Sequence, residues 1–141
     1  MMKIMLRLVL LLLFAAATVP AVAAAPPAKR PLAWVGTGVQ SERGAPPSRW
    51  RIRLAFDGQG NARIDYPSLH CGGVLIRRSQ HGAIVRYREH IRYGRGTCID
   101  GGTVTAWRRG NRLFWRWSGV NTRFPGIRAR ATLVLSRHRG R

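Results

Sequence analysis

Residues 49–56 read Arg-Trp-Arg-Ile-Arg-Leu-Ala-Phe, so cationic and apolar side chains alternate with a period of two. Successive side chains of an extended strand point to opposite faces, and this alternation therefore predicts a β-strand. One face would carry Trp50, Ile52, Leu54 and Phe56, and the other would carry the three arginines. A helix is disfavoured, because a period of 3.6 would mix the two kinds of side chain.

The same alternation recurs along most of the chain, separated by short segments rich in glycine. The expected strands are residues 32–40, 49–56, 62–66, 74–78, 83–93, 103–108, 112–118 and 128–137. We expect a loop at residues 41–48, which contain Gly44, Pro46 and Pro47, and a bend or bulge at residues 69–73. The sequence predicts an all-β fold, a small antiparallel meander of about seven or eight strands that closes into a barrel or a flattened sandwich.

The N-terminus has the three regions of a secretory signal peptide. Two basic residues precede an apolar run at residues 8–19, and small residues follow up to Ala25. We expect residues 1–24 to be removed on export to the periplasm or the medium. The alternative is an uncleaved membrane anchor, because the apolar run approaches the roughly 18 to 20 residues that span a bilayer.

The rest of the chain is predicted to form one domain. Residues 25–31 are rich in proline and alanine and predict a flexible arm, residues 32–137 a single β domain, and residues 138–141 a basic tail. About 115 residues suffice for one modest core and no more. After cleavage we expect membrane contact to be at most peripheral.

Cys71 and Cys98 are the only cysteines of the chain. In an exported protein a disulfide is the expected state of such a pair. Closing a loop of this length stabilises a domain by roughly 3 to 4 kcal/mol on the chain-entropy model. A redox-active thiol pair is the alternative, but the two cysteines lack the Cys-x-x-Cys spacing.

Glu89 stands out in the longest alternating segment, residues 83–93. The alternation places it on the predicted inner face, whose members are Val85, Tyr87, Glu89, Ile91 and Tyr93. A buried carboxylate is costly unless it is paired, protonated or in contact with a wet cavity. Three interpretations stay open: a structural pair with an arginine or a tyrosine hydroxyl, an interior polar anchor for a bound ligand, and a catalytic acid or base.

Other chemistry-bearing residues form no recognisable catalytic or metal site. Ser68, His70 and Asp100 are the residue types of a hydrolase triad, but no nucleophile elbow surrounds the serine, and turn hydrogen bonds are the simpler role. The four histidines show no metal-ligand spacing, so we expect no metal and no cofactor.

Tryptophans are expected to supply much of the core. Trp115 and Trp117 share one face of their predicted strand, with Trp50 and Trp107 nearby in the sheet. Such alternate tryptophans usually fill a small barrel. The alternative is a stacking platform for a sugar ring or a nucleobase, flanked by Arg112 and Arg116.

Basic residues outnumber acidic ones by 25 to five, which gives a formal net charge of +20. Such a charge attracts polyanions, and planar guanidinium groups suit bidentate capture of phosphate or carboxylate. The candidate anion-binding residues are Arg49, Arg51, Arg53, Arg86, Arg88, Arg92, Arg112 and Arg116. A solvated coat without a specific role is the other interpretation, and intracellular nucleic acid is not an expected partner.

Three sequence blocks carry a family resemblance: Tyr-Pro-Ser-Leu-His-Cys-Gly-Gly at 66–73, Glu-His-Ile-Arg-Tyr-Gly at 89–94, and Cys-Ile-Asp-Gly-Gly-Thr-Val at 98–104. Together they resemble an uncharacterised module of small exported bacterial proteins. They are also similar to extracytoplasmic segments of some actinobacterial serine/threonine protein kinases. The resemblance covers most of the chain after the signal peptide and implies no assigned activity, cofactor or functional residue.

These observations favour an exported, non-catalytic binding module with a strongly cationic arginine face. Its partner would be an anionic component of the cell envelope, such as a phosphorylated or acidic polymer, or an acidic protein. The alternative is a periplasmic inhibitor or immunity protein that blocks a cell-wall hydrolase. An enzyme that uses Glu89 is a third and weaker hypothesis, because no second carboxylate is placed to complete an acid/base pair.

Overall fold

A computed structural model describes residues 33–121, 124 and 126–138 of the chain. The predicted signal peptide and flexible arm lie outside the described residues, as do residues 139–141 of the predicted basic tail. The described part contains eight strands: β1 Ala33–Glu42, β2 Ala45–Phe56, β3 Ala62–Tyr66, β4 Cys71–His81, β5 Ile84–Tyr93, β6 Thr103–Arg109, β7 Arg112–Val120 and β8 Arg128–His138.

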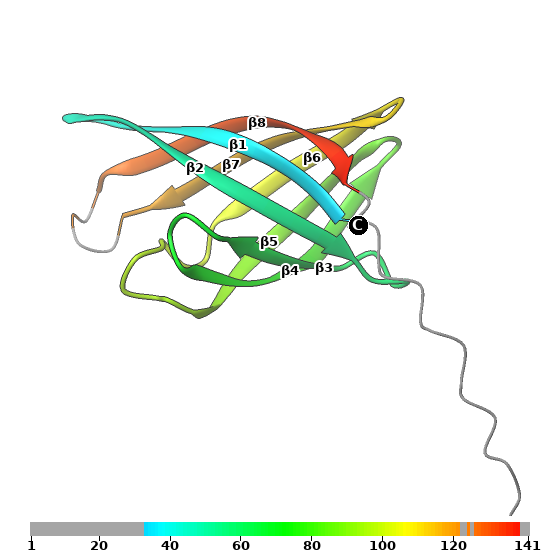
Figure 1. Cartoon of the computed structure of the whole chain (residues 1–141), viewed down its shortest axis with the longest axis horizontal. Helices are drawn as coiled ribbons and strands as arrows, with labels where there is room; N and C mark the ends of the chain where they lie inside the picture. The colour runs from blue at the N-terminus through cyan, green and yellow to red at the C-terminus, as the bar shows by residue number, and fades with distance from the viewer. Residues whose placement is uncertain (1–32, 122–123, 125, 139–141) are drawn as a thin grey trace, which may run out of the picture.

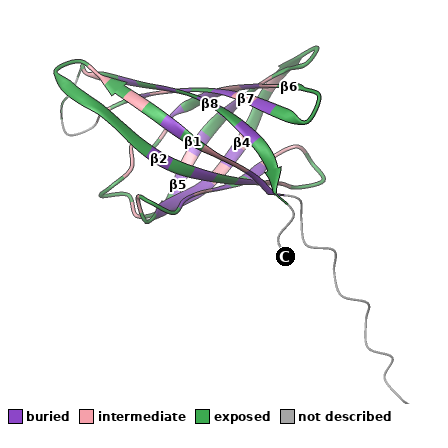
Figure 2. Cartoon of the chain, turned by 45° about the horizontal axis from the view of Figure 1, so that its top comes forward, coloured by how far each residue is buried: buried purple, intermediate pink, exposed green. Residues whose placement is uncertain are grey.

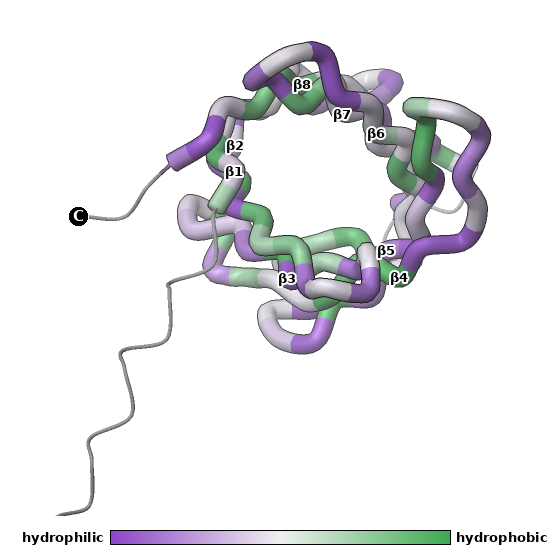
Figure 3. The backbone as a smooth tube through the Cα atoms, turned by 90° about the vertical axis from the view of Figure 1, so that its right-hand side faces the viewer, coloured by the Kyte–Doolittle hydropathy of each residue, from purple (hydrophilic) through white to green (hydrophobic). Residues whose placement is uncertain are grey.

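The strands form one closed antiparallel barrel in chain order (Figure 1). Each strand pairs with the next along the chain, and β8 returns to pair with β1, with Trp34 opposite Arg137 and Val39 opposite Thr132. Viewed from one end, the strands surround a single interior (Figure 3). The predicted all-β meander is confirmed, and of its two predicted forms the barrel is the one observed.

Alternation of side chains divides each strand between the barrel interior and the solvent. On β2 the buried residues are Trp50, Ile52 and Leu54, while the arginines between them are exposed. On β8 the pattern is unbroken from Arg128 to Leu135, as the banding of buried and exposed residues in Figure 2 illustrates. A closed barrel hides most apolar side chains and gives every strand a neighbour on both sides along at least part of its length, so the alternation and the closure support each other.

The predicted loop at residues 41–48 is wrong, because β1 and β2 form a long hairpin that turns at Arg43 and Gly44. Pro46 and Pro47 lie within β2. This segment pairs with β1 only, since the ladder to β3 begins at Arg53, and a register shift falls between Gln40 and Glu42. A strand paired on one side near a bulge tolerates residues without an N–H, which explains how proline fits here.

Tyr93 is a second correction, since it was expected inside and is half exposed. Gly72 faces Tyr93 while the next residue, Gly73, faces Ile91, so Arg92 is an extra residue in β5. This bulge reverses the alternation after Ile91 and turns Tyr93 outward, where its hydroxyl donates to Asp65. The bulge expected within residues 69–73 is instead on the partner strand, since residues 71–73 belong to β4 and the inserted residue is Arg92 of β5.

The two ends of the barrel differ in their connections. At one end, called the turn end, short turns join β2 to β3, β4 to β5 and β6 to β7. At the other, called the loop end, β1 meets β2, β3 meets β4, and longer connections run from β5 to β6 and from β7 to β8. The residues that the sequence marked as unusual gather at the loop end.

Candidate binding site at the loop end of the barrel

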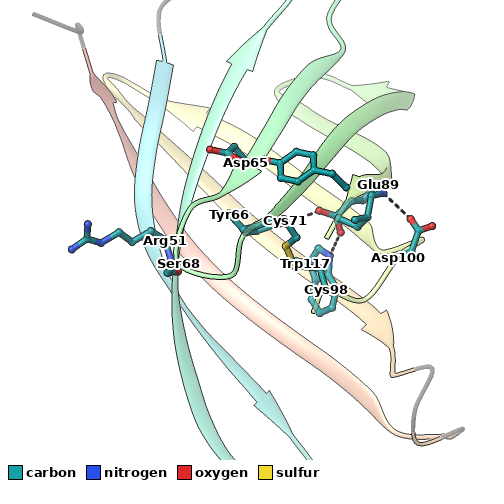
Figure 4. The surroundings of a disulfide bond; sticks show 11 residues. Arg51, Asp65, Tyr66, Ser68, Cys71, Glu89, Cys98, Asp100 and Trp117 are labelled. Atoms are coloured by element: carbon teal, nitrogen blue, oxygen red, sulfur yellow. Dashed lines mark hydrogen bonds between the residues drawn. A yellow bond between two sulfur atoms is a disulfide. The ribbon is translucent and has the colours of Figure 1, made fainter. Parts of the chain in front are cut away.

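Glu89 lies inside the barrel with 1% of its surface exposed. The Tyr66 hydroxyl donates to Oε1 at 2.6 Å, and the Trp117 indole N–H donates to Oε2 at 2.7 Å (Figure 4). β3, β5 and β7 each supply one member of this group. The hypothesis of a structural pair with a tyrosine hydroxyl therefore describes the observed contact, with a tryptophan as a second donor that the sequence did not single out.

Burial raises the pKa of Glu89 above its usual value, because a charged carboxyl loses its water. The two donors act in the opposite direction and limit the rise. Burial beside this carboxyl also raises the pKa of Tyr66 well above its usual value, so that its hydroxyl keeps its proton and remains a donor. Among the described residues, no arginine or histidine forms an ion pair with Glu89.

The connection from β5 to β6, residues 94–102, is fastened beside Glu89 by two kinds of bond. Cys71 at the start of β4 forms the predicted disulfide with Cys98 of this connection (Figure 4). Asp100 Oδ1 accepts the backbone N–H of Ile91 at 2.8 Å and that of Gly101 at 2.7 Å. The disulfide is consistent with an oxidising, extracytoplasmic compartment.

Gly102, the last residue of this connection, can pack closely against Glu89 and Trp117 because it has no side chain. A Cβ at this position would lie 2.2 Å from Trp117 Nε1 and 2.9 Å from Glu89 Oε2. Its backbone carbonyl accepts the N–H of Glu89 at 2.8 Å. Glycine is therefore needed here for close approach of backbone to side chain, and the connection packs directly against both the backbone and the side chain of Glu89.

A cavity of about 210 Å³ opens at the loop end and reaches Glu89. Its walls include three aromatic residues, Trp50, Tyr66 and Trp117, and its rim includes Arg95 and Glu42. The Glu42 carboxylate is held by side-chain amides, from Gln40 at 2.8 Å and from Asn121 at 3.1 Å. The sequence did not reveal this cavity, because its lining comes from five strands and three connections that only the closed barrel brings together.

The three residue types of a hydrolase triad do not form one. The Ser68 hydroxyl accepts the backbone N–H of Arg51 at 2.9 Å, which fastens the turn after β3 to the unpaired side of β2. Asp100 binds backbone groups as described, and His70 is an exposed turn residue with a φ of 53°. No cluster of three metal-ligating side chains occurs among residues 33–121, 124 and 126–138.

Tryptophan placement agrees with the core interpretation at three positions and differs at one. Trp50, Trp115 and Trp117 are buried in the barrel, whereas Trp107 lies on the outer surface of β6. Trp107 stacks on Phe114 of β7 with ring centroids 5.6 Å apart. The guanidinium of Arg116 lies 5.2 Å from the Trp107 ring and that of Arg109 5.9 Å from the Phe114 ring. These four residues are called the aromatic strip.

The eight candidate anion-binding arginines are all exposed. They lie on β2, β5 and β7, which are not neighbours in the barrel. The structure thus distributes these arginines around the outer surface. Two of them, Arg112 and Arg116 of β7, lie beside the half-buried outer rings of Trp107 and Phe114.

Comparison with protein-family models, with curated proteins and with solved structures found no match to this chain. Within the described residues, no helix has the length and apolar character needed to cross a bilayer. The three sequence blocks of the family resemblance meet around Glu89, since they supply Tyr66, both cysteines, Asp100 and Gly102.

Proposed function

We propose that the protein is an exported, non-catalytic binding module that engages an anionic polymer of the cell envelope through its arginines. The supporting observation is the state of these arginines. All arginines among the described residues are exposed, and none forms an ion pair with a carboxylate there. Exposed cations that no carboxylate of the described residues neutralises remain available to an external polyanion, and their attraction to it falls as salt rises.

Cross-strand neighbours show how the barrel carries this charge, although only Arg53 has an acid, Asp65, directly opposite it among the described pairs. Arg51 faces Thr37, Arg86 faces Thr105, and Arg116 lies between two threonines on neighbouring strands. Small hydroxyl neighbours avoid the destabilising contact of like charges directly opposite one another. Arg109 and Arg112, which face each other at the end of β6 and β7, are an exception.

The aromatic strip is the part of this surface best suited to an extended polymer. Its stacked rings offer apolar faces, with Arg109 and Arg116 against them, and a shallow groove continues past Thr132 and Val134 of β8. Val134 is 46% exposed and lies opposite Phe114. Sugar rings stack on such aromatic faces while guanidinium groups bind acidic substituents, so an acidic polysaccharide fits this chemistry.

The test measures binding of the purified domain to lipopolysaccharide, peptidoglycan and DNA at about 50 mM and about 200 mM salt. We expect binding that weakens strongly at the higher salt concentration. Replacing Arg109, Arg112 and Arg116 by glutamine should weaken binding more than the same replacement of Arg49, Arg51 and Arg53, although both variants lose three charges. Binding that is absent or indifferent to salt contradicts the proposal, and equal losses contradict the role of the strip.

A second candidate function is inhibition of a cell-wall hydrolase. The observation that favours it is Arg95, which lies exposed between two glycines on a connection held by a disulfide and by Asp100. A cationic side chain on a rigid loop suits an enzyme cleft that contains catalytic carboxylates. Protection of cell walls against a lytic enzyme, lost in Arg95→Ala, would support this function, and undiminished lysis would contradict it.

A further inference from the structure

The cavity at the loop end has a lining unlike the rest of the molecule. Glu42 and Glu89 both line it, although the whole chain has only five acidic residues. The outer surface of the barrel is dominated by arginine, so the cavity combines carboxylates and aromatic rings inside a cationic shell. A cationic group, which the arginines of the outer surface repel, would meet carboxyl groups and aromatic rings in this cavity.

Glu89 has unused capacity as an acceptor at the inner end of the cavity. A carboxylate offers about four acceptor sites. Tyr66 and Trp117 occupy one on each oxygen, and no positive group of the described chain neutralises the charge. A donor that carries a positive charge, such as an ammonium group, would both occupy a free acceptor site of Glu89 and neutralise the charge of its carboxylate. The aromatic walls would also attract such a cation through their ring faces.

Trp50 provides an independent indication of a ligand. It lines the cavity with 4% of its surface exposed, and its indole N–H has no hydrogen-bond partner. A buried donor without a partner is costly, and nearly all such groups in folded proteins are satisfied. An oxygen acceptor on a ligand would satisfy this N–H, which an ammonium group cannot do.

Arg95 supplies the complement to such an acceptor at the rim. Its Nε donates to the carbonyl of Ile91 at 2.9 Å, which holds the guanidinium base in place beside the opening. The cavity thus offers a carboxyl group at its inner end, aromatic walls, and a rim on which the Arg95 guanidinium lies together with a Glu42 carboxylate that two side-chain amides already hold. Its volume of about 210 Å³ exceeds the roughly 150 Å³ of an engineered cavity that binds benzene, so it can hold a molecule with a small apolar body.

We propose that this cavity binds a small zwitterion of amino-acid size, with its amino group on Glu89, its acid group toward Trp50 and Arg95, and its apolar body between the aromatic walls. This site is independent of the arginines on the outer surface. It requires no covalent chemistry, and its ligand differs in charge and size from the polymer proposed above.

Three probes that share one apolar body test the charge requirement: phenylalanine, phenethylamine, which lacks the acid, and 3-phenylpropionate, which lacks the amine. Leucine serves as a smaller body. Calorimetric titration of the disulfide-bonded domain measures each Kd. We expect phenylalanine or leucine to bind at least about tenfold more tightly than either singly charged analogue, because each analogue leaves one buried polar group without a partner.

Two variants with the same substitution locate the binding. Ser48 is an exposed residue of β2 that lines the opening, so Ser48→Trp should obstruct the cavity and abolish zwitterion binding without disturbing the core. Ser136 is an exposed residue of β8 that lies opposite Arg112 on the outer wall, and Ser136→Trp serves as the control. Both variants should unfold close to the temperature of the unmodified protein.

Each outcome decides for or against the proposal. Saturable binding of phenylalanine or leucine that is lost in Ser48→Trp and kept in Ser136→Trp supports it. Binding of phenethylamine equal to that of phenylalanine shows that the acid group is not recognised, and equal or tighter binding of 3-phenylpropionate shows attraction by arginine alone; either overturns it. Absence of binding by all four probes at millimolar concentration leaves only water in the cavity and also overturns it.

Discussion

The turn end and the loop end of the barrel are closed by different means. At the turn end, the turn after β2 is organised by Asp57, whose Oδ1 accepts the N–H groups of Gln59 and Asn61. Gly82 and Gly110 adopt positive φ in the two shorter turns. At the loop end, Glu89 is bonded to residues 23 and 28 positions away, and a disulfide joins positions 27 apart.

The two ends of the barrel therefore differ in their capacity to form a binding site. The hydrogen bonds of the turn end lie mostly within each turn, with the contact from the Arg77 N–H to Asn61 Oδ1 as a longer-range addition. The loop end needs partners from distant strands, and their convergence creates a cavity with polar groups whose hydrogen-bonding capacity is not exhausted. Four predictions test this contrast between the two ends.

The largest expected effect is that of adding one methyl group at the loop end. In Gly102→Ala the new Cβ would meet Trp117 and Glu89 at distances that no real contact shows, so the indole donor and the carboxyl group must move apart. We expect the free energy of unfolding to fall by about 3 kcal/mol. Gly58→Ala at the turn end is the matched control, because its Cβ would have no atom within 4 Å, and its effect should stay within about 0.5 kcal/mol. Denaturant titration of both variants measures the difference, and similar losses would contradict the contrast.

A smaller loss is expected when one hydrogen bond to Glu89 is removed. Trp117→Phe deletes the donor to Oε2, whereas Trp115→Phe deletes an indole N–H that has no partner. Both changes remove the same atoms from buried rings, so packing losses should be alike. We expect Trp117→Phe to cost about 2 kcal/mol more than Trp115→Phe, because a buried carboxyl loses a partner. Equal unfolding free energies for the two variants would show that the hydrogen bond contributes nothing.

Asp57 and Asp100 allow the two ends to be compared with the same chemistry. Each accepts two backbone N–H groups through one oxygen. Asp57 serves its own turn, whereas Asp100 also fastens a nine-residue connection to Ile91 of β5. We expect Asp57→Ala to cost about 1 kcal/mol and Asp100→Ala somewhat more. Hydrogen exchange should rise along residues 94–102 in the second variant only, and a rise confined to the turn end would contradict this prediction.

The smallest expected effect concerns pH. The pKa of Glu89 is raised by burial, so its neutral form is favoured in the folded protein and contributes most to stability below its ordinary value of about 4.5. That contribution is lost as the pH rises through the folded pKa. The stability of the protein relative to Glu89→Gln should therefore fall over this window. The pKa of Asp100 is lowered instead, because two backbone N–H groups outweigh its partial desolvation, and its contribution is lost only on acidification below about 3.8. A difference between the two proteins that rises with pH would contradict the first assignment.

The sequence predicted the fold because alternation is a local signal. Strand existence, inward residues such as Leu54 and Glu89, and the pairing of Cys71 with Cys98 all follow from spacing and composition. The prediction failed at Tyr93, where the inserted Arg92 reverses the alternation, and at Pro46, where one-sided pairing admits a residue that usually ends a strand. Both features depend on pairing with the neighbouring strand, and the sequence of one segment does not reveal that pairing.

The candidate site could be predicted only in part for the same reason. Glu89 was identified because it interrupts an apolar face, and Tyr66 belonged to the expected partner type. Trp117 was expected as core or as part of a stacking platform but not as a donor to Glu89, since nothing in its own strand relates it to a residue 28 positions earlier. The cavity and the unpartnered N–H of Trp50 follow from the closed geometry, so no local pattern could announce them.

The seam between β1 and β8 joins the first described strand to the last. Every other ladder links consecutive strands and can assemble as a growing ribbon, but this one has to wait until His138 is present. Until then both rims of the ribbon offer unsatisfied backbone groups to any other chain. The final step of assembly therefore converts an aggregation-prone sheet into a closed cylinder. A version of the protein shortened before β8 should avoid aggregation only while another molecule covers the two unpaired edges.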